Sequence, residues 1–239
     1  MSIAAQAARR RVAWTLGAIA VAWTFCEPLQ AQSRCFGTPA HGRLENGVQL
    51  PRSGANFSAY SALAGPLGRT HVHEQVRDVV VAAYGAMEKV APGKVFVYGE
   101  TGAQRGGPFK PHRSHENGLS VDFMVPVLDA AGKSVPLPTH AANRFGYGIE
   151  FDTQARFEGL RIDFEAMAEH LVQLHQAARG AGIDVGRVIF TPAFLPRLFA
   201  TTRGPYLQAH LRFMQREAWV RHDEHYHLDF DVACQPMAH

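Results

Sequence analysis

The sequence predicts an α+β fold, with a small, mainly antiparallel β-sheet, flanking helices and long loops. Helical and strand patterns are interspersed, but the connections between them are short and rich in glycine and proline. That arrangement favours α+β over a doubly wound parallel sheet. The chain has 239 residues, 46% of them hydrophobic, which is enough for one well-buried domain and short for two. We therefore expect a single domain after the N-terminal segment.

The N-terminal segment has the pattern of an export signal. A basic cluster at residues 9–11 precedes the uncharged apolar run 12–25. Because this run is shorter than the about 20 residues that a membrane span needs, we predict a secretory signal peptide over residues 1–31, cleaved after Ala31. Cleavage would leave no stable membrane anchor. A lipoprotein signal ending at Cys26 is the alternative, although the residues before it are poor ones for lipidation.

The charge and the cysteines of the remaining chain suggest an exported domain. Removing residues 1–31 takes away three arginines and one glutamate, so the formal net charge falls from +3 to +1. A nearly neutral domain gives no support for nucleic-acid binding, so we expect no such partner. Cys35 and Cys234 would remain, and an even pair in an oxidising compartment suggests one disulfide between the two ends of the domain. Two unpaired buried thiols are the alternative.

The first half of the domain predicts one helix and two strands. Residues 36–69 are rich in glycine, proline and polar residues and predict an irregular lead-in on the surface. Apolar residues then recur at three- and four-residue steps from Val76 to Val90, which predicts an amphipathic helix ending before Pro92. Residues 94–99 predict a strand, and a glycine-rich loop follows it.

The strand predicted over residues 119–125 carries a candidate site residue. Side chains alternate between the two faces of a strand. Leu119, Val121 and Phe123 therefore point to the core, whereas Ser120 and Asp122 point to the opposite face.

The second half of the domain predicts two helices and two strands. A polar loop, 129–152, precedes a helix that begins after the N-cap Asp163 and ends at Gly180. A short strand at 187–191, a third helical region at 205–218 and a closing strand at 225–232 complete the chain.

Five of the thirteen histidines fall in two short windows, His112 with His115, and His222 with His225 and His227. The two-residue period of the closing strand places His225, His227, Asp229 and Asp231 on one face and Tyr226, Leu228, Phe230 and Val232 on the other. A core strand that lines a polar site is expected to have such faces. Its two imidazoles could share a metal ion, or one could be a ligand and the other an acid-base group.

These residue types suit a zinc hydrolase. Catalytic zinc takes three protein ligands from His, Asp or Glu and leaves a fourth position for a water, whose pKa it lowers to about 7. His115 lies on the turn before a strand, and Asp122 lies on the site-facing side of that strand. With His227 from the closing strand they meet this requirement, which predicts a zinc site at the sheet.

The motifs resemble a known family. The stretch 114–122, with His115 and Asp122 separated by six residues, resembles the first zinc motif of the lysostaphin, D-alanyl-D-alanine metallopeptidase and hedgehog group, and 225–227 resembles its closing His-x-His. The run 222–227, together with His112, is most similar to the penicillin-insensitive murein endopeptidases. The segments around Cys35 and Cys234 also resemble that family, so the resemblance covers most of the chain after the signal segment.

The resemblance implies roles for individual residues. It implies that His115, Asp122 and His227 bind Zn²⁺, that His225 accepts or donates a proton, and that His112 and His222 line the site and help to hold the substrate or transition state. Glu224 stands three residues before His227, similar to the spacing of the glutamate base in the related carboxypeptidase branch. We favour His225 as the base, because strand alternation would turn Glu224 away from His225 and His227 if the strand extends as far as residue 224.

The implied function is hydrolysis of D-alanine-containing peptide cross-links of peptidoglycan by a metal-activated water, in the periplasm or outside the cell, by a zinc metallopeptidase domain over residues 32–239. A D-alanyl-D-alanine carboxypeptidase and a non-catalytic zinc-containing cell-wall-binding module are the alternatives.

Arg105, Lys110 and Arg113 could bind carboxylates of a wall peptide or form a solvated basic loop. His73-Glu74 begins a His-Glu-x-x-His pattern, but Arg77 occupies its last position.

Overall fold

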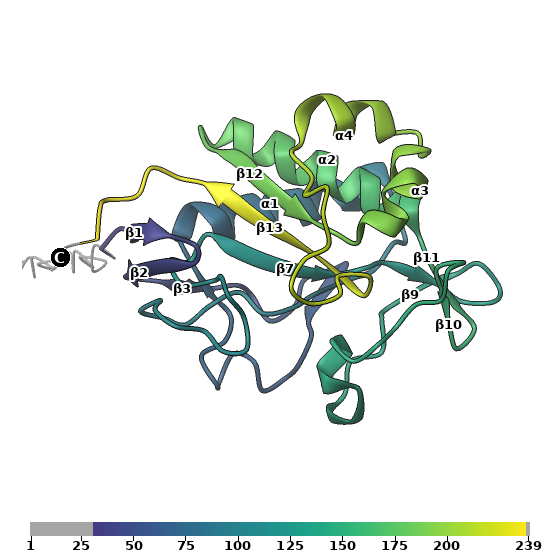
Figure 1. Ribbon diagram of the computed structural model, residues 1–239, viewed down its shortest axis with the longest axis horizontal. Coiled ribbons are helices and arrows are strands. Elements are labelled where there is room, and N and C mark those ends of the chain that lie inside the picture. The colour runs from purple at the N-terminus through teal and green to yellow at the C-terminus, as the bar shows by residue number, and fades with distance from the viewer. Residues whose placement is uncertain (1–30, 238–239) are drawn as a thin grey trace, which may run out of the picture. The chain divides into compact units, whose positions relative to one another are not determined.

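The computed structural model describes residues 31–237, so the predicted signal peptide lies outside the described residues except for Ala31. The central element is a five-stranded sheet with the order β12-β13-β7-β6-β4, of which Figure 1 labels β12, β13 and β7. Its strands are β4 (Phe57–Ala59), β6 (Phe96–Tyr98), β7 (Ser120–Met124), β12 (Asp184–Ile189) and β13 (His225–Asp231). Neighbouring strands are antiparallel except for β4 and β6, which are parallel. The predicted α+β fold with a mainly antiparallel sheet is confirmed.

Two long helices cover one face of this sheet (Figure 1). They are α1 (Glu74–Val90) and α2 (Phe164–Gly180). Tyr84 of α1 packs its ring 6.3 Å from that of Phe123 on β7, and His170 of α2 lies 5.1 Å from the same ring. The Asp163 side chain accepts a hydrogen bond from the Ala166 amide, as the predicted N-cap should. The helix-facing layer is therefore aromatic and apolar, which leaves the polar residues of β7 and β13 on the opposite face.

Smaller elements surround the central sheet. A four-stranded sheet contains β8 (Val127–Leu128), β9 (Ser134–Val135), β10 (Arg156–Phe157) and β11 (Leu160–Ile162), and two-stranded pairs join β1 (Arg34–Thr38) to β2 (His41–Glu45) and β3 (Val48–Gln49) to β5 (His71–Val72). Short helical segments are η1 (Ala141–Gly146), η2 (Pro192–Phe194), α3 (Leu195–Phe199) and α4 (Gly204–His210). None of the helices between residues 31 and 237 is long and apolar enough to span a membrane.

Two sequence expectations were wrong. Residues 36–69 are not wholly irregular, because β1 and β2 form a hairpin with Thr38 paired to His41. The sequence did not predict these strands because they are too short to show a clear alternation of polar and apolar residues. The third helical region ends at His210 instead of extending to residue 218. Beyond it the chain pairs with β12, where the Val188 amide donates to the Arg212 carbonyl and the Met214 amide donates to the Val188 carbonyl. Tertiary pairing thus overrides helix propensity.

A disulfide joins the two ends of the described domain. Cys35 on β1 and Cys234 after β13 are bonded across a sequence separation of 199 residues. The predicted pairing is confirmed, and it fixes β1 beside the segment that follows β13. The Gln235 amide donates to the Cys35 carbonyl at 2.9 Å beside this bond.

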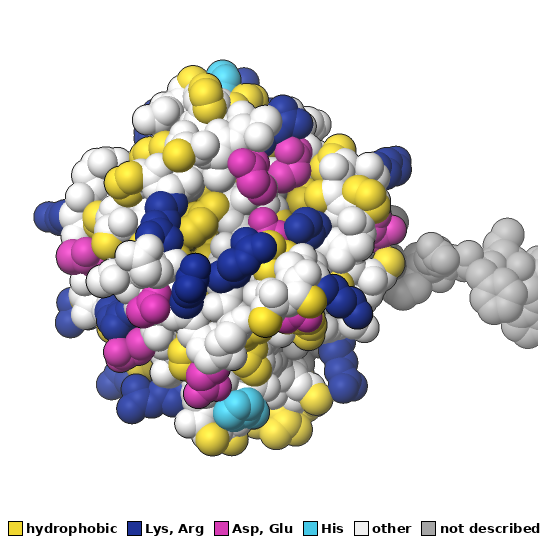
Figure 2. All heavy atoms as spheres, turned by 90° about the vertical axis from the view of Figure 1, so that its right-hand side faces the viewer, with side chains coloured by type: hydrophobic (Ala, Val, Ile, Leu, Met, Phe, Trp, Pro, Cys, Tyr) yellow, Lys and Arg dark blue, Asp and Glu magenta, His cyan; other side chains and the backbone are white. Residues whose placement is uncertain are grey.

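Lys and Arg side chains on one face of the molecule are mixed with acidic and hydrophobic side chains (Figure 2).

Candidate metal centre

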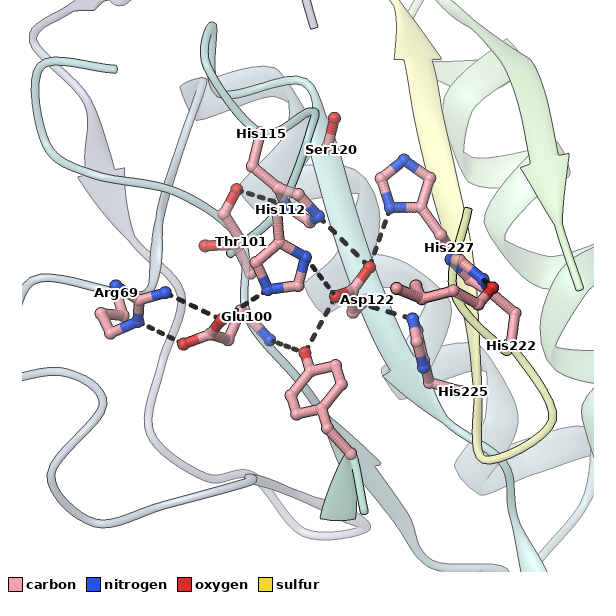
Figure 3. Close-up of polar contacts among 12 residues, drawn as sticks. Arg69, Glu100, Thr101, His112, His115, Ser120, Asp122, His222, His225 and His227 are labelled. Carbon is pink, nitrogen blue, oxygen red and sulfur yellow. Dashed lines mark hydrogen bonds and ion pairs between the residues drawn. The ribbon is translucent and has the colours of Figure 1, made fainter. Parts of the chain in front are cut away.

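The register of β7 against β13 brings Asp122 and His227 together. The two residues are direct partners across this antiparallel pair, as are Ser120 and Asp229, so their side chains share one face. The Nδ1 atom of His227 lies 2.8 Å from Oδ1 of Asp122. Both side chains are buried. Two predicted ligands from distant parts of the chain therefore meet on the sheet face opposite the helices (Figure 3).

His115 approaches the same carboxylate from the loop before β7. Its Nδ1 atom lies 2.9 Å from the Thr101 carbonyl oxygen, and because a carbonyl only accepts, Nδ1 carries the proton. The Nε2 atom is thus left with a free lone pair, 3.3 Å from Oδ1 of Asp122. This atom is buried and has no hydrogen-bond partner. The backbone of His115 adopts a left-handed φ of 71°, a strained conformation for a non-glycine residue that is often found at functional sites.

The residues present fit a zinc ion. Tetrahedral zinc with bonds of about 2.0–2.1 Å holds its ligand atoms about 3.3 Å apart, which is the separation of His115 Nε2 from Asp122 Oδ1, whereas His227 Nδ1 lies closer to that oxygen, at 2.8 Å. An unpaired buried imidazole nitrogen is costly, and a cation at this position would satisfy it. Although burial opposes ionisation, the surrounding histidines hold the pKa of Asp122 well below its ordinary range, so the carboxylate is charged and able to bind a cation.

His112 forms a second candidate combination. Ligand atoms of His112, His115 and Asp122 all lie within 4.8 Å of one another, so these three could hold a metal ion, and His227 is not part of this group. The Nδ1 atom of His112 lies 3.7 Å from Oδ2 of Asp122, whereas its Nε2 atom lies 2.6 Å from Oε2 of Glu100. His112 is thus held between two carboxylates and faces the opposite oxygen of Asp122 from His115 and His227.

Glu100 anchors His112 through a buried polar network. The Arg69 guanidinium and the Tyr60 hydroxyl both donate to this carboxylate. Burial alone would raise the pKa of Glu100, but the hydrogen bonds from Arg69 and His112 outweigh this effect and lower the pKa to about 2. A charged acceptor on Nε2 leaves Nδ1 of His112 directed at the site.

His225 is positioned by the residue that precedes it. Its Nδ1 atom lies 2.8 Å from Oε1 of Glu224, and its Nε2 atom lies 3.9 Å from Oδ2 of Asp122. Burial alone would lower the pKa of His225, but Glu224 and Asp122 outweigh this effect and raise the pKa above its ordinary value. The expectation that strand alternation turns Glu224 away was wrong, because β13 begins only at His225 and the Glu224 side chain folds back onto it.

His222 completes the cluster of histidines. Its ring centroid lies 4.5 Å from that of His225, and its Nδ1 atom lies 2.9 Å from the Val220 carbonyl oxygen. Burial lowers the pKa of His222 to about 3. The structure therefore brings the six predicted site residues into one cluster, in which His112, His115, His225 and His227 face Asp122 and His222 packs against His225.

Tyr147 is a site residue that the sequence did not reveal. Its hydroxyl donates to Oδ2 of Asp122 at 2.9 Å and accepts from the Glu100 amide at 2.8 Å. Gly99 makes room for it, because a Cβ atom there would lie 2.5 Å from the hydroxyl oxygen. Nothing in the polar loop 129–152 distinguishes this tyrosine. Glu100 was also missed, although its place directly after a predicted strand was an available signal.

The site opens into a cavity of about 690 Å³. Its walls include site histidines 112, 222, 225 and 227, and its remaining wall carries apolar side chains from the segments around residues 60–67, 144–149 and 219–220. The His73-Glu74 pattern plays no part here, because His73 is the N-cap of α1 and accepts from the Gln75 amide. Both His71 and His73 are buried.

One protein family matches this chain. The sequence model described as penicillin-insensitive murein endopeptidase matches residues 35–238. No curated protein matches. The match spans nearly all of the described residues, including every residue of the candidate centre.

Proposed function

Because the chain belongs to the penicillin-insensitive murein endopeptidase family, we propose that it is a zinc-dependent peptidase that hydrolyses D-alanine-containing cross-links of peptidoglycan. Family membership implies a peptidase that acts on the cell wall. The observation that supports a metal-dependent mechanism is the buried, unpaired Nε2 atom of His115 beside Oδ1 of Asp122. Membership of the wider lysostaphin and D-alanyl-D-alanine metallopeptidase group is part of this proposal.

The proposed zinc ligands are His115 Nε2, Asp122 Oδ1 and His227 Nδ1. His115 and His227 both face Oδ1, whereas His112, His225 and Tyr147 gather at Oδ2. This division favours His227 over His112 as the third ligand. Bound zinc would polarise the scissile carbonyl and lower the pKa of its water to about 7.

His225 is the proposed acid-base residue. Glu224 accepts the proton of Nδ1, which leaves Nε2 of His225 free to take a proton from the attacking water and return it to the leaving amine. Glu224 thus orients the imidazole, much as a buried carboxylate orients a catalytic histidine elsewhere. Tyr147 fixes Oδ2 of Asp122, and His112 and His222 line the cavity where the peptide would bind. No covalent enzyme intermediate is required.

The proposed domain extends over residues 32–239, follows a cleaved signal peptide and acts in the periplasm or outside the cell. The nearest alternative is a D-alanyl-D-alanine carboxypeptidase, which would release free D-alanine. A zinc-containing module that binds wall fragments without cutting them is the non-enzyme alternative.

The test is to incubate the purified mature protein with cross-linked peptidoglycan, with and without a chelator, and to resolve the products by mass. His115→Ala is the test variant, and His210→Ala, at an exposed histidine of α4, is the matched control. We expect cross-linked dimers to disappear only when metal and His115 are both present. Release of D-alanine would indicate the carboxypeptidase, and zinc binding without any cleavage would leave the binding module.

A further inference from the structure

The cavity contains one cationic side chain that no acidic group neutralises. Three arginines line it, Arg69, Arg144 and Arg221. The Arg69 guanidinium is paired with Glu100, and that of Arg221 is paired with Asp223 and with Glu150. Among the residues that the structure describes, 31–237, none forms an ion pair or a hydrogen bond with the side chain of Arg144. It is therefore the cavity cation available to an external anion.

The backbone that carries Arg144 is held in an unusual conformation. Arg144 and Phe145 have φ values of 52° and 58°, both in the left-handed region. For non-glycine residues this conformation costs of order 1 kcal/mol each and persists only where the surroundings enforce it. Two consecutive residues in this conformation indicate that contacts around the segment determine its backbone conformation.

The enforcing contacts are visible around the neighbouring Asn143. Its Oδ1 atom accepts from the His140 and Gly146 amides at 3.0 and 2.9 Å, and its Nδ2 atom donates to the Pro138 carbonyl at 2.7 Å. The Phe145 ring packs edge-on against Tyr60, with 6.1 Å between centroids. These contacts hold the backbone of the segment in place and so fix the position at the cavity from which the Arg144 side chain extends.

Beside the Arg221–Glu150 ion pair, the rim carries exposed apolar side chains. Leu63, Leu67, Trp219 and Val220 are 58%, 68%, 39% and 53% exposed, and all four line the cavity. A cavity with a largely apolar rim, whose other charges are paired, and one unneutralised cation suits an extended, largely uncharged peptide that carries a carboxylate. Arginine matches a carboxylate through two parallel N–H···O bonds.

We propose that Arg144 binds a free carboxylate of the cross-linked wall peptide and determines which peptides the site accepts. This inference rests on the proposed function, since it assigns the substrate group that the cavity recognises. The carboxylate is either a chain-terminal one or a side-chain one, and both offer the same chemistry. The basic loop residues considered from the sequence, Arg105, Lys110 and Arg113, do not line the cavity, although Arg113 lies 6.0 Å from the ring centroid of Trp219.

The experiment combines a change in the protein with a change in the substrate. Arg144→Gln removes the charge, Arg144→Lys keeps it without the paired donors, and Arg105→Gln, at an exposed arginine outside the cavity, is the matched control. The substrates are a cross-linked peptide dimer and versions of it in which each free carboxylate is converted in turn to an amide. Cleavage rates are measured with mature protein, and binding of each dimer is measured under chelation, where cleavage stops.

We expect Arg144→Gln to lower kcat/KM on the native dimer by about 10- to 100-fold, mainly through KM, the effect typical of a lost charge-assisted bond. Wild-type protein should lose a similar factor on one amidated dimer, and on that dimer Arg144→Gln should lose nothing further. Arg144→Lys should be intermediate, and Arg105→Gln should match wild type.

Equal losses on the native dimer and on every amidated dimer would overturn the proposal, because they would mean that Arg144 acts only through the structure of its loop. If wild-type protein cleaved no dimer, the proposed function would fail. The binding measurement would still decide the role of Arg144, since equal affinity of wild type and Arg144→Gln for the native dimer would contradict it.

Discussion

The Nε2 atom of His227 lies 2.8 Å from Oδ1 of Asp229, its neighbour on the same face of β13. Asp229 also accepts from the Ser120 hydroxyl at 2.6 Å and from the Arg187 guanidinium, so its orientation is fixed from two further strands. The carboxylates of Asp229 and Asp122 face the two ring nitrogens, and although burial opposes protonation, they raise the pKa of His227 to about 10, so both nitrogens carry protons in this structure. A metal ion at Nδ1 would replace the proton shared with Asp122, while Asp229 would keep the proton on Nε2 and hold the ring in place.

Replacing Asp229 should therefore weaken metal binding without removing a proposed ligand. Asp229→Asn should lower zinc affinity by about 10- to 100-fold, the range typical for partners of ligating histidines, as measured by competition with a chromogenic chelator. Asp231→Asn, at the exposed end of the same strand, is the control and should bind zinc like wild type. Unchanged affinity in Asp229→Asn would contradict the proposed orientation of His227.

The two candidates for the general base should separate by mutation. In the proposed mechanism His225 transfers the proton and Glu224 orients it, so His225→Ala should reduce kcat by about 100- to 10,000-fold while the zinc content stays the same. Glu224→Gln keeps an oxygen that can accept from Nδ1 and should have a smaller effect. Single-turnover cleavage of a cross-linked dimer measures both. A larger loss in Glu224→Gln than in His225→Ala would move the base to the glutamate.

Stability should fall in acid because a histidine is buried in the core. Burial lowers the pKa of His170, which stacks against Tyr84 and contacts the Tyr226 hydroxyl, to about 3. Between that value and the ordinary 6.5 the unfolded chain binds the additional proton, so the free energy of unfolding decreases as the pH falls through this range.

His170→Phe should flatten this dependence by up to about 1.4 kcal/mol per pH unit. Urea unfolding at several pH values between 4 and 6 gives the slope. The slope of His222→Phe is compared with that of His170→Phe, because burial also lowers the pKa of His222 to about 3. An unaltered slope in His170→Phe would show that His170 is already protonated in the folded protein.

The disulfide should make a large contribution to stability. Cys35 and Cys234 close a loop of 199 residues, for which the chain-entropy treatment gives about 5 kcal/mol. Reduction, or the double variant Cys35→Ser with Cys234→Ser, should lower the urea midpoint of unfolding. Adding a reductant to the double variant should change nothing. If reduction left the midpoint of the wild-type protein unchanged, the cross-link would contribute no stability.

Much of the fold followed from local patterns. The three- and four-residue spacing before Pro92 predicted α1, and the N-cap Asp163 predicted the start of α2. The alternation in 225–232 predicted β13 with its two faces. The prediction of a helix over residues 205–218 was wrong in its second half because residues 212–214 pair with β12. No local pattern indicates a pairing partner that lies far away in the sequence.

The candidate site was predicted where its residues are clustered in sequence and missed where they are not. His112, His115, His222, His225 and His227 are concentrated in two windows, and the structure brings those windows together. Tyr147 and Glu100 contribute single polar atoms from separate segments, so only the packing of the loops reveals them. Glu224 was misplaced because the start of β13, and hence the direction of its side chain, depends on the pairing with β7.

The most direct test of the central claim is a crystal structure of the zinc-loaded protein, with anomalous diffraction data collected on both sides of the zinc absorption edge. We predict one zinc peak, about 2.0–2.2 Å from His115 Nε2, Asp122 Oδ1 and His227 Nδ1, with Nε2 of His227 still bonded to Asp229. A peak held by His112 in place of His227, or no zinc peak between β7 and β13, would contradict the proposed centre.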